Sequence, residues 1–105
     1  TSIRVPTPNV SLIDLTFVSN KEVTSESIND AMSKASNGPL KGILATNSAP
    51  LVSKDFNHNP HSSIFDLTQT QVIKGKFSRV LSWYDNECGF SNRMCDTAIQ
   101  IAGLI

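Results

Sequence analysis

The sequence predicts an α+β fold, with a mostly antiparallel or mixed sheet and helices packed on one face. Segments of extended character occur early, in the middle and late in the chain, and two other segments carry apolar residues at helical spacing. The expected order is strand, helix, strand, strand, strand, helix, which includes both a crossover and a hairpin connection. The five glycines form no Gly-x-Gly-x-x-Gly stretch, so the chain is not itself a dinucleotide-binding domain.

The first half of the chain predicts a strand, a helix and a second, short strand. Apolar and polar residues alternate over 10–18, as in a strand with one face in the core. The residues expected on the core face are Ile13, Leu15 and Phe17. A helix then begins after Thr24, a favourable N-cap, and ends where Gly38 precedes Pro39. The apolar run 42–45 predicts a short buried strand.

The second half predicts a long loop, a hairpin and a closing helix. Residues 47–63 are rich in Asn, Ser, Pro and His, which favour turns, although a short strand could lie at 51–53. The segments 64–73 and 77–84 should be the two arms of a hairpin joined by a Lys-Gly-Lys turn. A helix of about 89–105 should close the chain, because its apolar residues recur at helical steps.

Composition excludes several classes of function. Nine Lys and Arg balance nine Asp and Glu, so no net field favours DNA, RNA or an anionic membrane. The apolar runs are far shorter than the ~20 residues that span a bilayer, and no export signal is recognisable. We therefore expect no nucleic-acid partner and no membrane partner.

The two cysteines indicate a reducing compartment. On one helix, Cys88 and Cys95 would lie about 10 Å apart along the axis, which is too far for a disulfide. Two free thiols favour a cytoplasmic protein. Neither cysteine has a sequence neighbour that would lower the pKa of its thiol, so neither is expected to be a catalytic nucleophile.

Asn86 is a candidate ligand-binding residue, because it lies in the Trp-Tyr-Asp-Asn-Glu junction between the last strand and the last helix. A side-chain amide offers one donor and one acceptor together, and a rigid strand-to-helix junction can fix their direction. The nicotinamide carboxamide presents the complementary pair. The structural alternative is that Asn86 only caps the last helix.

Arg4 is a candidate phosphate-binding residue. A guanidinium makes two parallel hydrogen bonds to phosphate oxygens and stays charged at every working pH. Pro6 and Pro8 make the following segment stiff and extended. Taken by residue type alone, a solvated surface arginine is the more common outcome.

A metal site is not expected. His58 and His61 have an allowed ligand spacing, but no further His or Cys completes a closed site around them. The Asn and Pro between the two histidines indicate a loop, in which their side chains would form local hydrogen bonds.

Three segments together resemble the C-terminal part of phosphorylating glyceraldehyde-3-phosphate dehydrogenases of the bacterial type. They are Arg-Val-Pro-Thr-Pro-Asn-Val-Ser at 4–11, Ser-Lys-Asp-Phe-Asn at 53–57, and the stretch from Ser82 to Arg93. The resemblance implies that 1–105 is the C-terminal part of the catalytic domain, with the closing helix, and that the nucleotide-binding domain is absent from this chain.

The resemblance also implies an activity and its site residues. Family members convert glyceraldehyde 3-phosphate, NAD and inorganic phosphate to 1,3-bisphosphoglycerate in glycolysis, as cytoplasmic homotetramers. By this likeness Arg4 binds phosphate groups and Asn86 contacts the nicotinamide carboxamide. The family's catalytic cysteine, in its Ser-Cys-Thr-Thr-Asn motif, and its histidine base have no counterpart here, so the chain alone should be inactive. Two departures occur where many members have aromatic residues: Cys88, and Phe90 in place of a tyrosine.

Two other interpretations remain open from the sequence. Erythrose-4-phosphate dehydrogenase is a sister activity with similar C-terminal motifs. The chain could also be a non-catalytic binding or interaction module, because an apolar stripe on the last helix needs a partner surface.

Overall fold

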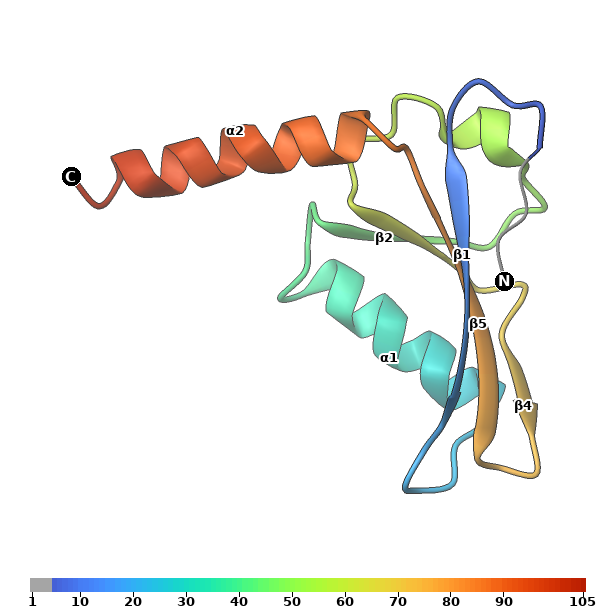
Figure 1. The fold of residues 1–105 in the computed structure, drawn as a ribbon. Coiled ribbons are helices and arrows are strands. Elements are labelled where there is room, and N and C mark those ends of the chain that lie inside the picture. Colours follow the sequence, from blue (N-terminus) through green and yellow to red (C-terminus); the bar gives the residue numbers. More distant parts are fainter. Residues whose placement is uncertain (1–4) are drawn as a thin grey trace.

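The computed structural model describes residues 5–105 and confirms the α+β fold class (Figure 1). Arg4 lies outside the described residues. The elements in order are β1 Ser11–Val18, α1 Ser25–Asn37, β2 Leu44–Asn47, the 3-10 helix Ser53–Phe56, β3 Ser63–Asp66, β4 Gln71–Ile73, β5 Phe77–Tyr84 and α2 Cys88–Ala102. Within this part of the chain, the five strands form one mixed, open sheet in the order β1-β5-β3-β2, with β4 also paired to β5.

Strand β5 organises the sheet. Along one edge it pairs antiparallel with the whole of β1, from Ser11 opposite Tyr84 to Val18 opposite Phe77. Along the other edge, β4 pairs with the first half of β5 and β3 with the second half, both antiparallel. Strand β2 then adds to β3 in parallel, which is the crossover pair.

The single strand expected over 64–73 is wrong, because a turn divides it into β3 and β4. The side chain of Asp66 causes this turn: its Oδ1 accepts hydrogen bonds from the backbone N–H of Thr68 at 3.0 Å and from the Thr68 hydroxyl at 2.6 Å. Such a local side-chain acceptor competes with the strand ladder and favours a turn. The predicted hairpin is confirmed with a shorter first arm, because β4 pairs antiparallel with β5.

Two other short predictions need correction. The strand expected at 42–45 begins later, at Leu44, because residues up to Ile43 form a turn in which Gly42 has a φ of 80°. The short strand at 51–53 is absent, and a 3-10 helix begins at Ser53 instead. The Asp55 carboxylate accepts a hydrogen bond from the Val52 N–H at 2.9 Å, which stabilises that tight turn.

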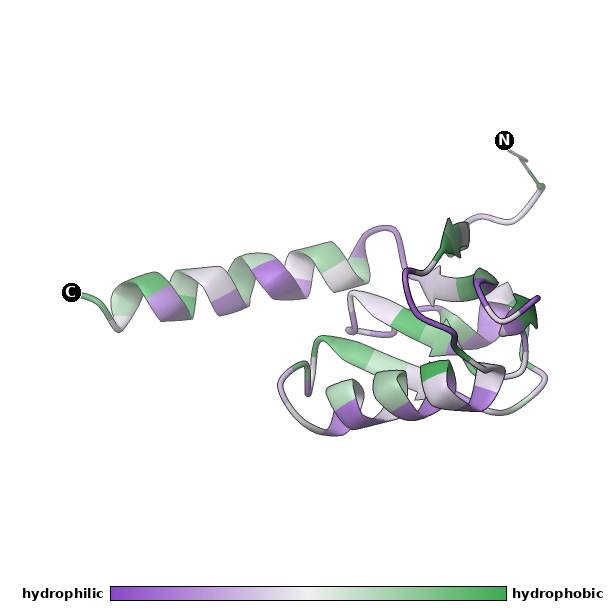
Figure 2. Cartoon of the chain, turned by 90° about the horizontal axis from the view of Figure 1, so that it is seen from below, coloured by the Kyte–Doolittle hydropathy of each residue, from purple (hydrophilic) through white to green (hydrophobic). Residues whose placement is uncertain are grey.

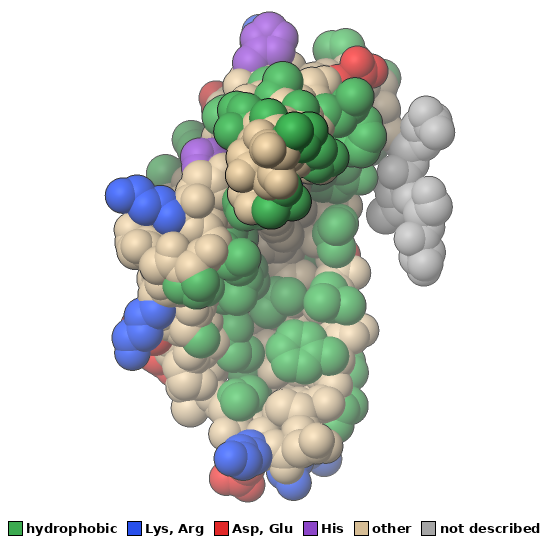
Figure 3. All heavy atoms as spheres, turned by 90° about the vertical axis from the view of Figure 1, so that its left-hand side faces the viewer, with side chains coloured by type: hydrophobic (Ala, Val, Ile, Leu, Met, Phe, Trp, Pro, Cys, Tyr) green, Lys and Arg blue, Asp and Glu red, His purple; other side chains and the backbone are tan. Residues whose placement is uncertain are grey.

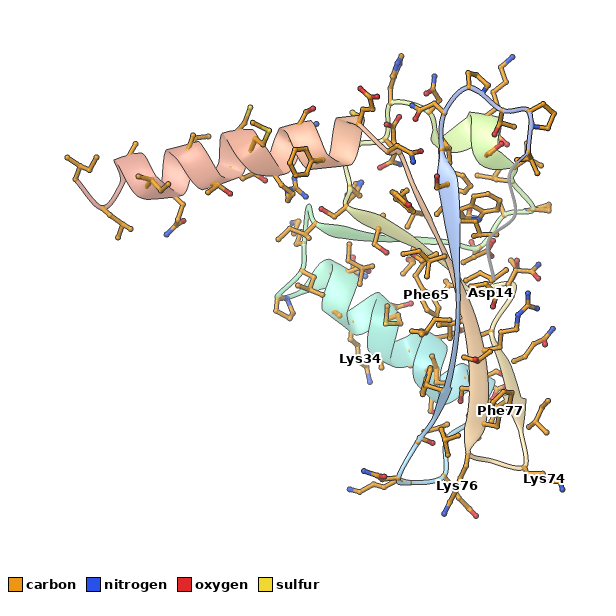
Figure 4. All side chains as sticks on the ribbon, in the orientation of Figure 1. Asp14, Lys34, Phe65, Lys74, Lys76 and Phe77 are labelled. Atoms are coloured by element: carbon orange, nitrogen blue, oxygen red, sulfur yellow. The ribbon has the colours of Figure 1, made fainter. Side chains whose placement is uncertain are left out.

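Helix α1 covers one face of the sheet and begins as the sequence predicted. The Thr24 hydroxyl accepts a hydrogen bond from the Ser27 N–H at 3.1 Å, and the Ser27 hydroxyl accepts one from the Thr24 N–H at 2.9 Å. This reciprocal cap satisfies two helix-terminal donors. Figure 4 shows Phe65 between the sheet and α1. The apolar cluster between them consists of Leu44, Phe65 and Val80 with Ile28, Met32, Ala35 and Leu67.

The core face expected for β1 is oriented correctly but is not buried. Leu15 lies opposite Val80, which faces α1, so both side chains are on the α1 side of the sheet. Ile13, Leu15 and Phe17 are nevertheless 52%, 50% and 37% exposed, because α1 packs on β2, β3 and β5. Figure 3 shows hydrophobic side chains gathered on this side of the molecule, below α2.

Helix α2 leaves the sheet and is attached mainly by its first two turns (Figures 1 and 2). A Cβ atom at Gly89 would stand 2.8 Å from the carbonyl oxygen of His61, so the helix approaches that loop too closely for any larger residue. The Arg93 guanidinium donates to the Gly42 carbonyl at 3.2 Å and to the Ser62 hydroxyl at 3.3 Å. Further along the helix, the large apolar residues are exposed. Over residues 5–105 neither helix has the length and apolar character that crossing a membrane requires.

Candidate functional site

The candidate site is the junction where β5 ends and α2 begins, and the structure confirms that Asn86 lies between a strand and a helix. The turn Asp85-Asn86-Glu87 forms this junction, and the segment leading into β1 runs beside it, because Ser11 pairs with Tyr84. The loop after the 3-10 helix also reaches the junction through His58. Three segments that are distant in the sequence therefore meet here.

The carboxylate of Asp85 holds these segments together. Its Oδ1 accepts hydrogen bonds from the backbone N–H groups of Glu87 at 2.9 Å and Cys88 at 2.8 Å. Its Oδ2 accepts one from the His58 N–H and one from the Asn9 side-chain amide, both at 2.8 Å. Asp85 is only 2% exposed, so its four acceptor positions are used inside the protein.

The hydrogen bonds to Asp85 decide its charge state. Burial acts to raise the pKa of this carboxyl group. The opposite effect of its four hydrogen bonds is larger in total, and these come from the N–H groups of Cys88, Glu87 and His58 and from the Asn9 amide. The net result is a pKa well below the ordinary value for aspartate, so Asp85 is ionised at neutral pH. Two of these donors, the N–H groups of Glu87 and Cys88, lie at the start of α2, where a negative charge also suits the helix dipole.

Asn86 projects from this turn as an exposed side chain. Its amide nitrogen donates to the Ser11 hydroxyl at 2.7 Å, and its carbonyl oxygen accepts no hydrogen bond from the residues that the structure describes. The capping role that was the structural alternative for Asn86 is filled by Asp85, which binds the first N–H groups of α2. Asn86 thus retains one acceptor and one N–H for a ligand.

The backbone beside Asn86 is strained. Val10 has a φ of 76°, although a β-branched residue rarely adopts the left-handed region. Its side chain is buried against Phe56 and Ile64. Its neighbours on either side, Asn9 and Ser11, make the contacts to Asp85 and Asn86.

The other candidate residues take different parts. Within residues 5–105, no group of three His, Cys, Asp or Glu side chains could hold a metal ion. His58 contributes its backbone N–H to Asp85, and the His61 ring contacts the Asn59 side chain at 2.8 Å. Cys88 and Cys95 are both free, and the Asn92 side-chain amide lies 3.6 Å from the Cys88 sulfur.

A shallow, open and largely polar hollow adjoins the junction. Its lining residues are Pro8, Asn9, His58, Asp85, Glu87, Cys88 and Ser91. Asn86 is not among them and faces solvent beside Ser11.

Sequence reasoning selected Asn86 but missed Asp85. The missed signal was an aspartate just before a predicted helix. From there its side chain can accept hydrogen bonds from the N–H groups two and three residues later, as a helix cap does. The contacts from Asn9 and His58 had no local signal, because both residues arrive from distant parts of the chain.

Comparison with known proteins gives one consistent result. The family model described as glyceraldehyde 3-phosphate dehydrogenase, C-terminal domain, matches residues 1–86. The glyceraldehyde-3-phosphate dehydrogenase of Xanthobacter flavus is 60% identical over 104 residues, and that of Cereibacter sphaeroides is 56% identical over 104 residues. Glyceraldehyde-3-phosphate dehydrogenase 1 of Bacillus subtilis is 52% identical over 101 residues.

These matches cover 96–99% of this chain but only 30–31% of each relative. The chain therefore spans slightly less than a third of the length of these relatives. Both the family model and the relatives agree with the resemblance carried by the three sequence motifs. The chain belongs to the glyceraldehyde-3-phosphate dehydrogenase family and corresponds to its C-terminal domain.

Proposed function

We propose that this chain is the C-terminal part of the catalytic domain of an NAD-dependent, phosphorylating glyceraldehyde-3-phosphate dehydrogenase. The whole enzyme would be a cytoplasmic homotetramer that converts glyceraldehyde 3-phosphate and inorganic phosphate to 1,3-bisphosphoglycerate. The family match supports the reaction class. The observation that carries the site assignment is the exposed Asn86 amide, whose nitrogen donates to Ser11 and whose oxygen has no partner within residues 5–105.

Asn86 would contact the nicotinamide carboxamide of NAD. Its free carbonyl oxygen can accept from the carboxamide NH₂, and its remaining N–H can donate to the carboxamide oxygen. The residues therefore fit this part of the cofactor. NAD supplies the hydride acceptor when bound, and the contribution of Asn86 is to fix which face of the ring is presented to the substrate.

Arg4 would bind the phosphate groups of the sugar substrate and of inorganic phosphate. The support for this role is its place in the Arg-Val-Pro-Thr motif and the chemistry of a guanidinium, which pairs with phosphate through two parallel hydrogen bonds. The charge of Arg4 would stabilise the substrate without taking part in covalent steps.

The nucleophile and the general base would come from outside this chain. A thioester mechanism needs a cysteine thiolate and a base within hydrogen-bond reach of it. Among residues 5–105, neither Cys88 nor Cys95 has a hydrogen bond to a histidine that could act as this base. The chain alone is therefore proposed to be inactive, with its own nucleotide-binding domain as its first partner.

The test is a steady-state assay of the full-length enzyme by NADH formation. Arg4→Ala should lower kcat/KM for glyceraldehyde 3-phosphate by about 100-fold, as expected for lost hydrogen bonds to a charged group. Arg79→Ala is the matched control, because Arg79 pairs with Asp14 on the surface at 2.6 Å. The control should stay within about twofold of the parent.

The same assay separates the alternatives. Faster turnover of erythrose 4-phosphate than of glyceraldehyde 3-phosphate would assign the sister activity. An absence of NAD-dependent oxidation with either sugar would support the non-catalytic module. Equal losses in Arg4→Ala and Arg79→Ala would remove the phosphate role of Arg4.

A further inference from the structure

Two side-chain contacts join the turn before α2 to the segment that enters β1. Asn9 donates to the Asp85 carboxylate at 2.8 Å, and two residues later Ser11 accepts from Asn86 at 2.7 Å. These contacts hold the segment and the turn together at two points. A side chain fixed in this way loses little freedom when a ligand binds it.

The strained residue Val10 lies between these two contacts. A φ of 76° is unfavourable for a β-branched residue and persists only where the surroundings impose it. Here the surroundings are the buried packing of Val10 and the hydrogen bonds of its two neighbours. The strain indicates that the relation between segment and turn is fixed by these contacts.

The two oxygens of Asp85 have separate tasks. Oδ1 binds the N–H groups of Glu87 and Cys88 at the start of α2, whereas Oδ2 binds Asn9 and His58, which belong to other segments. An asparagine at this position could keep its oxygen on the helix side. Its NH₂ group would then face the Asn9 amide and the His58 N–H, which are also donors.

We infer that Asp85 and Ser11 are positioning residues that hold the Asn86 amide in the direction required for the nicotinamide carboxamide. Ser11 fixes the amide nitrogen, and Asp85 fixes the turn that carries Asn86 against the segment that carries Ser11. Neither residue needs to touch the cofactor. This inference rests on the proposed contact between Asn86 and NAD.

The experiment measures the dissociation constant for NAD by isothermal titration calorimetry on the full-length protein, together with the melting temperature of each variant. Ser11→Ala should weaken NAD binding about fivefold, and Asp85→Asn about tenfold or more, as expected when one or more hydrogen bonds that hold a binding group are lost. The kcat of the bound enzyme should change less than KM for NAD.

Each variant has a matched control elsewhere in the sheet. Ser63→Ala removes a serine whose hydroxyl bonds Ser82, between β3 and β5. Asp66→Asn alters a second buried carboxylate, only 4% exposed, which binds Thr68 and the Trp83 ring N–H. Both controls should lower the melting temperature but change the dissociation constant for NAD less than about twofold.

The dependence on Asn86 is tested by a double-mutant cycle. Asn86→Ala alone should weaken NAD binding, and adding Ser11→Ala to it should then have no further effect, because Ser11 acts only through Asn86. Additive losses would contradict the positioning role. If Asp85→Asn is too unstable to purify, Ser11→Ala and the cycle decide the question.

The outcomes distinguish the inference from the proposed function. If Asn86→Ala weakens NAD binding while Ser11→Ala and Asp85→Asn match their controls, the positioning role is wrong and the cofactor contact stands. If Asn86→Ala leaves the dissociation constant unchanged, the cofactor contact is wrong and the positioning role fails with it.

Discussion

Asp85 links the stability of the protein to pH at the scale of a single residue. Its pKa in the folded protein lies below the value of about 3.9 expected in the unfolded chain, so its stabilising effect is complete above that pH. The effect is lost as the pH falls from about 4 toward the lower, folded pKa. An unfolded state that binds the proton more readily becomes favoured in acid.

We therefore predict that Asp85→Asn makes the free energy of unfolding less dependent on pH below about 4. The slope of this free energy against pH should fall by up to ~1.4 kcal/mol per pH unit. Urea unfolding of the full-length protein over a pH series measures this. Asp14→Asn is the control: the hydrogen bond from Arg79 also lowers the pKa of Asp14, but this carboxylate is exposed. An equal flattening in both variants would contradict a special role for Asp85.

Ser78 gives a second prediction at the residue scale. It is fully buried, and its hydroxyl has no hydrogen-bond partner among the described residues. Replacing an unpaired buried hydroxyl with a methyl group removes its desolvation cost. Ser78→Ala should raise the free energy of unfolding by about 1 kcal/mol in urea titrations. A loss of stability as large as that of Ser63→Ala would indicate that Ser78 has an unrecognised partner.

The same residues show how far sequence could predict the site. Asn86 could be selected, because its amide chemistry and its place at a strand-to-helix junction are both local properties. The role of Asp85 depends on donors from Asn9 and His58, which only the folded chain brings together. Val10 gave no signal at all, because nothing in a β-branched residue predicts a positive φ.

At the scale of elements, features set by local residues were predicted more accurately than features set by strand pairing. Helix α1 starts at the predicted cap because Thr24 and Ser27 bond each other within one turn. The strand expected over 64–73 failed because Asp66 turns the chain, and because β3 and β4 share the length of β5. The pairing of β3 and β4 with different halves of β5 depends on the folded chain and leaves no periodic pattern in the sequence.

The attachment of α2 gives a prediction for an element. Gly89→Ala would place a Cβ atom 2.8 Å from the backbone carbonyl oxygen of His61, so the helix or the loop must move. We expect a loss of about 1–3 kcal/mol in the free energy of unfolding. We also expect weaker NAD binding, because Cys88, the neighbour of Gly89, donates its N–H to Asp85, which lies in the same turn as Asn86.

Gly103→Ala at the other end of α2 is the matched control, since the nearest atoms to its Cβ position are 3.5 and 3.6 Å away. Its melting temperature should equal or slightly exceed that of the parent. If both variants unfold at the parent temperature, the close approach at Gly89 does not restrain the helix.

At the scale of the whole molecule, two apolar surfaces lack a cover within residues 5–105. One is the α1 side of β1, with Ile13, Leu15 and Phe17, and the other is α2, with Phe90, Met94 and Ile99. Surfaces of this kind are typical of interfaces with other domains. We propose that the rest of the full-length enzyme covers them.

Residues 1–105 expressed alone should therefore bind the dye ANS more strongly, per unit mass, than the full-length enzyme and should associate in sedimentation experiments. Isolated chains that stay monomeric and bind no dye would mean that these surfaces need no partner. The interaction-module interpretation would then lose its physical basis as well.

A crystal structure of the full-length enzyme with NAD bound would show whether Asn86 contacts the nicotinamide carboxamide. We predict that the Asn86 amide lies about 3 Å from the nicotinamide carboxamide, with Ser11 still bound to its nitrogen. Asp85 should keep its contacts to Asn9, His58, Glu87 and Cys88. A carboxamide held by other residues, with Asn86 turned away from the cofactor, would contradict the assignment of this junction as the nicotinamide site.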